Sequence, residues 1–153
     1  MSPSAGILAD QNRAHREEIV ALLQQAYWME IETVMSYITN SINPDGVRAQ
    51  EIIESLQADI TEELGHAQQF ANRIKELYGV VPGSMDFTPE QQTDIVHVIR
   101  GVIEAESGAI EHYNRIIEAC DGVDWATQDM VIDILRDEEG HLRQFERYLR
   151  EFE

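Results

Sequence analysis

Two segments of the sequence place a histidine three residues after a glutamate: Glu63 with His66, and Glu138 with His141. Residues three apart lie on the same face of an α-helix, so each pair can direct a carboxylate and an imidazole at one point. The eight-residue blocks that begin at these glutamates, ELGHAQQF and EEGHLRQF, are identical at five positions. This repetition favours two equivalent groups of metal ligands over two unrelated surface pairs.

Two further glutamates follow the same repetition. Glu30 lies seven residues before Tyr37, and Glu106 lies seven residues before Tyr113. The distance from each glutamate to the Glu-x-x-His block that follows is 33 residues in the first half and 32 in the second. We infer that one pair of helices occurs twice, which predicts a pseudo-twofold axis through the fold.

The elements that must position these residues are helices. Proline and glycine are sparse and divide the chain into four long segments, each with apolar residues at helical spacing. Asn43-Pro44 and Thr88-Pro89 each predict a helix cap followed by a first-turn proline, and Gly79 predicts the end of a helix. The predicted helices cover about residues 13–41, 43–78, 88–120 and 124–153.

The connection between the second and third predicted helices, residues 80–87, is the one long connection. About nine extended residues, at about 3.3 Å each, span roughly 30 Å, enough to run along much of a helix bundle. The second and third helices are therefore predicted to be parallel, as in bundles with a crossover. We expect an all-α four-helix bundle over residues 13–153, preceded by a tail of residues 1–12.

The candidate ligands interrupt the apolar faces of these helices. The stripe of the first helix runs through Leu23 and Ala26 and reaches its next core position at Glu30, and Glu106 interrupts the third helix in the same way. Unpaired buried carboxylates are very costly, and no lysine or arginine occupies the neighbouring core positions. Two divalent cations would balance the charge of four buried glutamates.

A glutamate from each of two helices with Glu-x-x-His from the other two is the di-iron or di-manganese arrangement of four-helix bundles. Oxygen-rich ligation with one imidazole for each metal suits iron or manganese better than a thiolate-seeking metal. The predicted ligands, and the residues on which catalysis would depend, are Glu30, Glu63, His66, Glu106, Glu138 and His141.

Four other residues are candidates for contact with the ligands. Tyr37 and Tyr113 either fill the core or donate hydrogen bonds to ligand carboxylates. Glu62 and Asp137 directly precede the glutamates of the two repeats, and they are either surface acids or acceptors for a ligand histidine.

The remaining candidates are assigned to other roles. Glu32 and Glu104 fall on polar helix faces and are excluded as ligands. Surface positions are predicted for His15, His97 and His112, packing roles for Trp28 and Trp125, and a buried apolar position for Cys120.

Composition excludes several classes of function. The chain has 153 residues, of which 29 are acidic and 11 basic, for a formal net charge of −18. Such a charge repels a phosphate backbone, so we expect no nucleic-acid partner. No apolar run approaches the about 20 residues that span a membrane, and no signal peptide is expected. With a single cysteine and no internal disulfide, a cytoplasmic location is expected.

The segment QDMVIDILRDEEGH, residues 128–141, resembles the fourth-helix signature of bacterioferritins, within the ferritin-like di-iron carboxylate superfamily. The resemblance extends over about residues 14–150. It implies that Glu30 and His66 bind one iron, that Glu106 and His141 bind the other, and that the glutamates of the two repeats bridge them.

The chain departs from that family in two places. Leu64 stands where bacterioferritins carry a haem-ligating methionine, so haem is not expected. Twelve residues follow His141, too few for the short fifth helix that lines the symmetry axes of ferritin cages. A homo-oligomer is still expected, and a smaller shell, a dimer and a monomer all stay open.

The predicted function is that of a non-haem di-iron ferroxidase that oxidises Fe²⁺ with O₂ or H₂O₂ for iron detoxification or storage. The alternatives are a rubrerythrin-like peroxidase, a manganese catalase-like enzyme and an iron-sequestering shell without catalysis. A metal-free interaction bundle, with protonated carboxylates and water in its core, is the least specific alternative.

Overall fold

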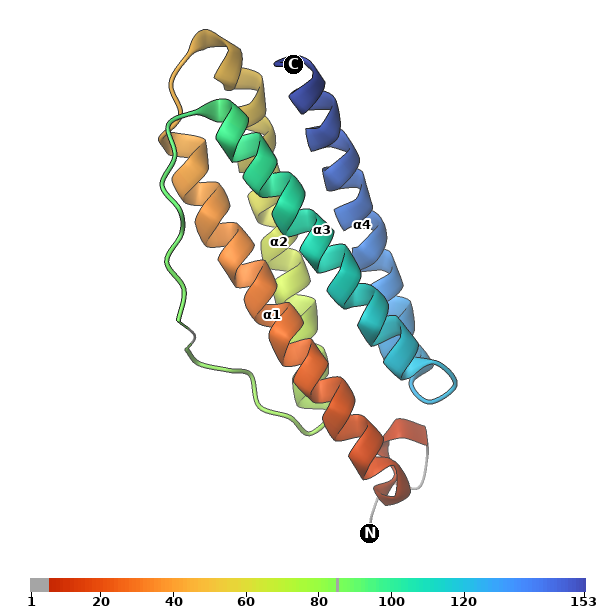
Figure 1. Ribbon diagram of the computed structural model, residues 1–153. Coiled ribbons are helices and arrows are strands. Elements are labelled where there is room, and N and C mark those ends of the chain that lie inside the picture. The colour runs from red at the N-terminus through yellow and green to blue at the C-terminus, as the bar shows by residue number, and fades with distance from the viewer. Residues whose placement is uncertain (1–5, 85) are drawn as a thin grey trace.

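A computed structural model describes residues 6–84 and 86–153, and in these ranges the chain forms four long helices and no strand. They are α1 (Arg13–Ile42), α2 (Gln50–Glu76), α3 (Ile95–Cys120) and α4 (Trp125–Arg150), with short 3₁₀ turns at Gly6–Leu8, Asp10–Asn12 and Val47–Ala49. Figure 1 shows an elongated bundle in which α1 and α2 form one hairpin and α3 and α4 the other.

The predicted crossover is confirmed. The chain leaves α2 at one end of the bundle, runs beside α1 for most of its length and enters α3 at the other end (Figure 1). The side-chain amide of Gln24 donates to the carbonyl of Val80 at 2.8 Å, and the backbone N–H of Gln92 donates to Oδ1 of Asn40 at 3.2 Å. These contacts attach both ends of the crossover to α1, and α2 and α3 are therefore parallel.

The predicted starts of the second and third helices are wrong. Helix α2 begins at Gln50 rather than near Asn43, because Gly46 has a φ of 109°, which breaks any helix that starts at Pro44. Helix α3 begins at Ile95 rather than near Thr88, and its cap is the Asp94 side chain, which accepts from the Val96 amide. The crossover is correspondingly longer than predicted; its residue 85 lies outside the described ranges.

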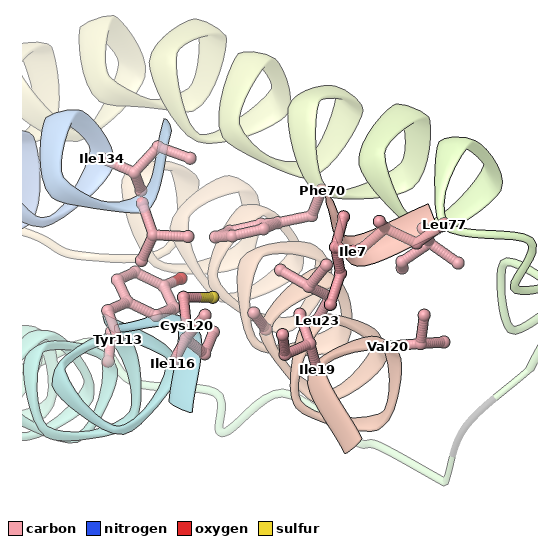
Figure 2. Packing of buried hydrophobic residues seen from close by; sticks show 14 residues of the cluster. Ile7, Ile19, Val20, Leu23, Phe70, Leu77, Tyr113, Ile116, Cys120 and Ile134 are labelled. Carbon is pink, nitrogen blue, oxygen red and sulfur yellow. The ribbon is translucent and has the colours of Figure 1, made fainter. Parts of the chain in front are cut away.

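Two hydrophobic clusters fill the bundle on either side of its middle. The first is packed around Leu23, Phe70 and Ile116, as Figure 2 shows, and includes the fully buried Cys120. The second lies around Leu56 and shares no buried residue with the first. The side chains between the two clusters are polar, and they include all six predicted ligands.

The segment before α1 packs against the bundle where the structure describes it. Ile7 is buried in the first cluster, and the buried Arg16 donates to the carbonyls of Ile7 and Ala9 at 3.0 and 3.2 Å. Residues 1–5 of the predicted tail lie outside the described ranges. Within those ranges, no helix is both long and apolar enough to cross a membrane.

The two tryptophans differ from each other. Trp28 is half-buried, but Trp125, the first residue of α4, is 72% exposed. The prediction of a packing role is therefore wrong for Trp125. Its neighbours Asp124 and Thr127 are buried against Arg73 of α2, so Trp125 lies off the covered face of this turn.

The end of α2 depends on a close approach rather than on a left-handed glycine. Tyr78 adopts the positive φ of 68°, and the Gly79 amide donates to the Ile74 carbonyl at 2.8 Å. A Cβ at Gly79 would lie 2.6 Å from Cγ1 of Val20 and 3.0 Å from the Ile74 carbonyl oxygen. Neither contact can relax easily, because Val20 is stiff and the carbonyl belongs to the helix.

We predict that Gly79→Ala lowers the free energy of unfolding by about 1–3 kcal/mol through this overpacking. The matched control is Gly101→Ala in α3, where a Cβ meets no atom within 4 Å. There the added methyl group should stabilise the helix by about 0.5–1 kcal/mol. Urea unfolding of the two variants tests the prediction, and equal stabilities would contradict it.

Candidate metal centre

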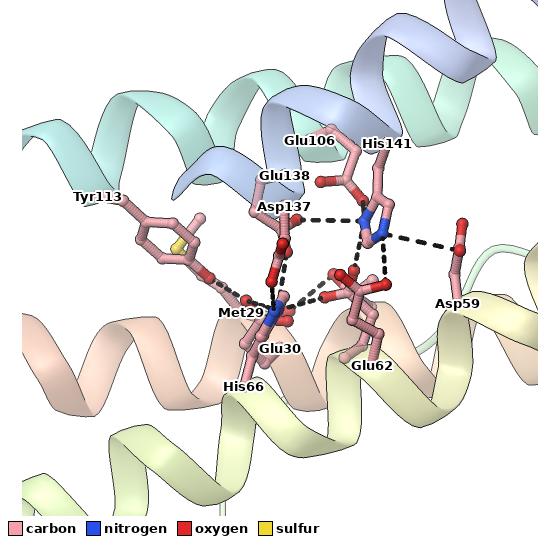
Figure 3. Close-up of polar contacts among 12 residues, drawn as sticks. Met29, Glu30, Asp59, Glu62, His66, Glu106, Tyr113, Asp137, Glu138 and His141 are labelled. Carbon is pink, nitrogen blue, oxygen red and sulfur yellow. Dashed lines mark hydrogen bonds and ion pairs between the residues drawn. The ribbon is translucent and has the colours of Figure 1, made fainter. Parts of the chain in front are cut away.

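The six predicted ligands come together in the middle of the bundle, one or two from each helix (Figure 3). Each is almost completely buried, with exposed fractions between 0% for Glu63 and 6% for His141. Helices α1 and α3 contribute one glutamate each, and α2 and α4 contribute one Glu-x-x-His each. The four helices have similar lengths and lie side by side, so their middles are at the same level of the bundle (Figure 1).

The ligand atoms form two overlapping groups, in each of which the atoms lie within 4.8 Å of one another. Both groups contain Glu63 and Glu138. The first group adds Glu30 and His66, and the second adds Glu106 and His141. Two ions could therefore each have a glutamate and a histidine of their own and share the other two glutamates.

The histidines turn Nδ1 toward the centre of the site. His66 Nδ1 lies 2.9 Å from Glu138 Oε1, and His141 Nδ1 lies 2.9 Å from Glu63 Oε1. Each imidazole thus approaches the shared glutamate of the opposite helix more closely than the one three residues before it. This crossed arrangement joins α2 to α4 through the site.

The outward nitrogens of the histidines contact two acids that also cross between α2 and α4. Nε2 of His66 lies 2.9 Å from Asp137, and Nε2 of His141 lies 3.2 Å from Glu62. A carboxylate at this position accepts the Nε2 proton and leaves the Nδ1 lone pair for a metal. Asp137 and Glu62 therefore hold the tautomer that ligation through Nδ1 requires.

The two tyrosines bond the glutamates of the opposite half. Tyr37 donates to Glu106 Oε1 at 2.5 Å, and Tyr113 donates to Glu30 Oε1. Burial, followed by the nearby carboxylates, raises the pKa of both tyrosines well above the usual range, so both remain donors. Glu106 and Glu30, the terminal glutamates of the site, thus each have Oε1 fixed by a tyrosine, while Oε2 has no hydrogen-bond partner within the described residues.

Seven oxygen and nitrogen atoms of the site are buried without a hydrogen-bond partner within the described residues. They are Oε2 of Glu30 and Glu106, both oxygens of Glu63, Oε1 of Glu138 and Nδ1 of both histidines. Buried polar atoms are almost always paired, so a converging set of this size fits a ligand that accepts their lone pairs. Five oxygens and two imidazole nitrogens form a donor set that suits iron or manganese.

Protons balance part of the charge in the metal-free centre. Burial raises the pKa of Glu30 well above its usual range, and burial together with Glu106 raises the pKa of Glu138 to about 11. Burial lowers the pKa of His141, but the neighbouring carboxylates of Glu106 and Glu63 outweigh burial and raise that pKa to about 12. Metal binding must therefore displace protons.

Glu63 behaves differently from the other glutamates. Burial raises its pKa, but the close contacts with Glu30 and with both histidines outweigh burial and lower the pKa below its usual range. The carboxylates of Glu138, Glu30 and Glu63 raise the pKa of His66, against the opposing effect of burial. Glu63 is therefore the fixed negative charge around which the protons of the metal-free site are arranged.

The sequence analysis missed Asp59. This α2 residue is 9% exposed, and its Oδ1 lies 3.7 Å from Nε2 of His141. Burial raises its pKa to about 6. Its position could have been recognised, because Asp59 lies one helical turn before Glu63 and continues the same face.

The prediction of a surface position is wrong for His112 and correct for the other two histidines. His112 is 2% exposed, and its Nε2 donates to the Leu22 carbonyl at 2.9 Å. Burial lowers its pKa, so it is a neutral core residue that joins α3 to α1. His15 is exposed, and His97 pairs with Glu90 at 3.1 Å on the surface.

The two acids excluded as ligands lie outside the centre. Glu32 and Glu104 line a groove of about 320 Å³ between α1 and α3, beneath the crossover. Tyr37, which donates to Glu106, also lines this groove.

Residues 20–153 match the family model described as the ferritin-like domain. The chain belongs to this family. The four-helix bundle follows the family fold.

Two relatives and one solved structure illustrate this membership. The bacterioferritin of Desulfovibrio desulfuricans is 22% identical over 91% of this chain and 78% of its own length. The DNA protection during starvation protein of Pyrococcus furiosus is 27% identical over 87% of this chain and 77% of its own. The dodecameric thioferritin of Bacteroides fragilis, a bacterioferritin-related protein, superposes with a TM-score of 0.83 at 24% identity, over 90% of this chain and 87% of that one.

We predict that Asp137→Asn weakens divalent-cation binding about 10–100-fold, because the neutral amide no longer fixes the charge and tautomer of His66. Asp133→Asn is the matched control, since Asp133 lies one turn earlier on α4 and pairs only with the exposed Arg136. Titration of both variants with Co²⁺ measures the difference. Equal affinities would show that Asp137 does not hold the histidine.

Proposed function

We propose that this protein is a ferroxidase that oxidises Fe²⁺ with O₂ or H₂O₂. The observation that carries the proposal is the pair of overlapping ligand groups that share Glu63 and Glu138. Membership of the ferritin-like domain family and the similarity to a bacterioferritin support it.

The substrate is a pair of Fe²⁺ ions. Glu30 and His66 would hold one ion, Glu106 and His141 would hold the other, and the two shared glutamates would contact both. Four carboxylates then face four positive charges in a site that water does not reach, so the buried charge is balanced. The protons held by the metal-free site leave as the ions bind.

In the reaction each Fe²⁺ loses one electron. Two Fe²⁺ and two protons reduce O₂ to H₂O₂, or two Fe²⁺ and two protons reduce H₂O₂ to two waters. The carboxylates favour Fe³⁺ over Fe²⁺ because their negative charge stabilises the higher positive charge. Tyr37 and Tyr113 keep Glu106 and Glu30 in place through Oε1. No side chain has to act as a general base, because the iron ions supply the electrons.

We predict that Glu63→Ala and His141→Ala each reduce the initial rate of Fe²⁺ oxidation more than about 100-fold. Loss of a residue that only hydrogen-bonds to a metal ligand already reduces metal affinity or activity about 10–100-fold, and these two variants lose a ligand itself. Glu104→Gln is the matched control, because Glu104 lies two residues from Glu106 but is exposed outside the centre. Absorbance of Fe³⁺ after mixing the metal-free protein with Fe²⁺ in air measures the rate. Wild-type rates in the first two variants would refute the ferroxidase.

Two further measurements separate the alternative enzymatic functions from the ferroxidase. Iron that turns over only with an added electron donor and H₂O₂ would indicate a peroxidase. Manganese in protein from its native host, with disproportionation of H₂O₂, would indicate a catalase-like enzyme.

A storage or sequestration role requires assembly, and we propose that the chain forms a homo-oligomer. The apolar side chains of Met35, Ile38 and Ile42 are 40–71% exposed along one face of α1, and large exposed apolar faces mark interaction surfaces. The similar thioferritin is dodecameric. We predict that native mass spectrometry gives a mass several times that of one chain. A measured mass equal to that of one chain would exclude the shell.

A further inference from the structure

Three side chains of the described residues join α2 directly to α4 by hydrogen bonds. Two are the histidines of the centre, His66 and His141, and the third is Arg73. Nε of Arg73 donates to the hydroxyl of Thr127 at 2.7 Å, and Nη2 donates to Oδ1 of Asp124 at 3.0 Å. Arg73, Asp124 and Thr127 thus form an arginine bridge between the last turns of α2 and the start of α4.

The arginine bridge is buried and has one well-defined geometry. Asp124 and Thr127 are almost completely buried, and the side chain of Arg73 is 16% exposed. Oδ1 of Asp124 also accepts from the backbone N–H of Thr127 at 3.0 Å, and Oδ2 accepts from the Thr127 hydroxyl. A planar guanidinium that donates from two nitrogens to two fixed acceptors is held in a single orientation. The bridge therefore fixes the position of α4 relative to α2 at this end of the bundle.

The bridge lies on the helix faces that carry the metal ligands. Arg73 follows His66 by seven residues, about two turns of α2, and Glu138 follows Thr127 by eleven residues, about three turns of α4. Each side of the bridge thus shares a face with a ligand of its own helix. The contact between His66 and Glu138 is only 2.9 Å long, so a sliding or rotation of one helix that breaks the bridge also breaks this contact.

The repeat indicates that closure of the bundle does not require a polar contact at such a position. In the repeat that relates Glu63 to Glu138, the counterparts of Arg73, Asp124 and Thr127 are Tyr148, Ala49 and Ile52. These counterparts belong to the second hydrophobic cluster, so the opposite end of the contact between α2 and α4 closes by apolar packing. Apolar packing in place of a buried ion pair is often neutral or stabilising, whereas polar pairing fixes a unique register in some proteins. The bridge is therefore better suited to setting the helix register than to adding stability.

We propose that Arg73 is a positioning residue of the metal centre, which sets the register of α2 against α4 before any ion binds. In the metal-free centre seven donor atoms of the described residues lack hydrogen-bond partners, so the centre itself fixes that register only weakly. The arginine bridge supplies the missing constraint from about two turns away and keeps the donors of α2 and α4 at the spacing that the ions need. The proposal rests on the proposed function, because it takes the centre to bind two divalent ions.

The test titrates the metal-free full chain with Co²⁺, whose visible absorption depends on the geometry of its ligands. Arg73→Met should weaken Co²⁺ binding about tenfold and change the absorption spectrum of the bound ion, in protein that circular dichroism shows to be folded. The direction is informative, because the loss of a positive charge would by itself strengthen cation binding. Arg115→Met is the matched control, since it removes an arginine whose pair with Glu111 is exposed on α3. It should keep the affinity and the spectrum of the wild type.

Two further variants complete the test. Arg73→Lys keeps the charge and a single donor group, so it should restore part of the lost affinity. Thr127→Val covers the case in which Arg73→Met does not fold. It removes one acceptor of the bridge and keeps the shape of the side chain, and it should also weaken Co²⁺ binding and change the spectrum.

Wild-type or tighter Co²⁺ binding, with a wild-type spectrum, in folded Arg73→Met or in Thr127→Val would overturn the proposal and leave the ferroxidase assignment standing. Absence of Co²⁺ binding by the wild type would refute the metal centre, and this proposal with it. Since Co²⁺ binding requires no oxidation of iron, failure of the ferroxidase assay alone would leave the role of Arg73 unaffected.

Discussion

Four glutamates buried at one level of a helical bundle are the constraint on which the rest of this structure depends. In the described residues no lysine or arginine forms an ion pair with any of them, so their charge is balanced by protons on the histidines and on some of the glutamates. Such a centre is costly without a compensating charge. The flanking hydrophobic clusters must therefore carry most of the favourable free energy of folding, and they occupy both ends of the bundle.

The helix hairpins cannot form the centre alone. Each hairpin supplies two glutamates and one histidine, and the contacts that complete the site pass between hairpins: Tyr37 to Glu106, Tyr113 to Glu30 and each histidine to the opposite helix. The crossover makes α2 parallel to α3, and all four helices lie side by side in one bundle (Figure 1). The side-chain contacts of the site therefore also connect the two helix hairpins, and they form only when the hairpins pack correctly against each other.

Near-symmetry and its break have different consequences. Where the repeat is kept, the two halves offer the same donors, which suits a substrate of two identical ions. Where it is broken, at Arg73 and the corresponding Tyr148, one end of the bundle is joined by polar contacts and the other by apolar packing. A duplicated helix pair can thus retain a symmetric centre and still close its two ends differently.

The sequence by itself determined the presence of four helices, the crossover and the burial of the four glutamates of the centre, because helical periodicity relates residues of one helix to a buried or an exposed face. Glu30 and Glu106 could be separated from Glu32 and Glu104 on this basis alone. Local turn signals were less reliable, since Asn43-Pro44 and Thr88-Pro89 have the composition of helix starts but lie in non-helical segments. The burial of His112 and the exposure of Trp125 likewise depend on which neighbouring helix covers a given turn.

Only the tertiary structure decided how the helices meet. The pairing of His66 with Asp137, of His141 with Glu62 and of each tyrosine with a glutamate depends on the register between helices, and spacing along one helix carries no information on that register. The place of Asp59 beside His141 was decided in the same way. Sequence periodicity identifies the face of a helix, whereas the partner that the face meets is set by packing across the whole bundle.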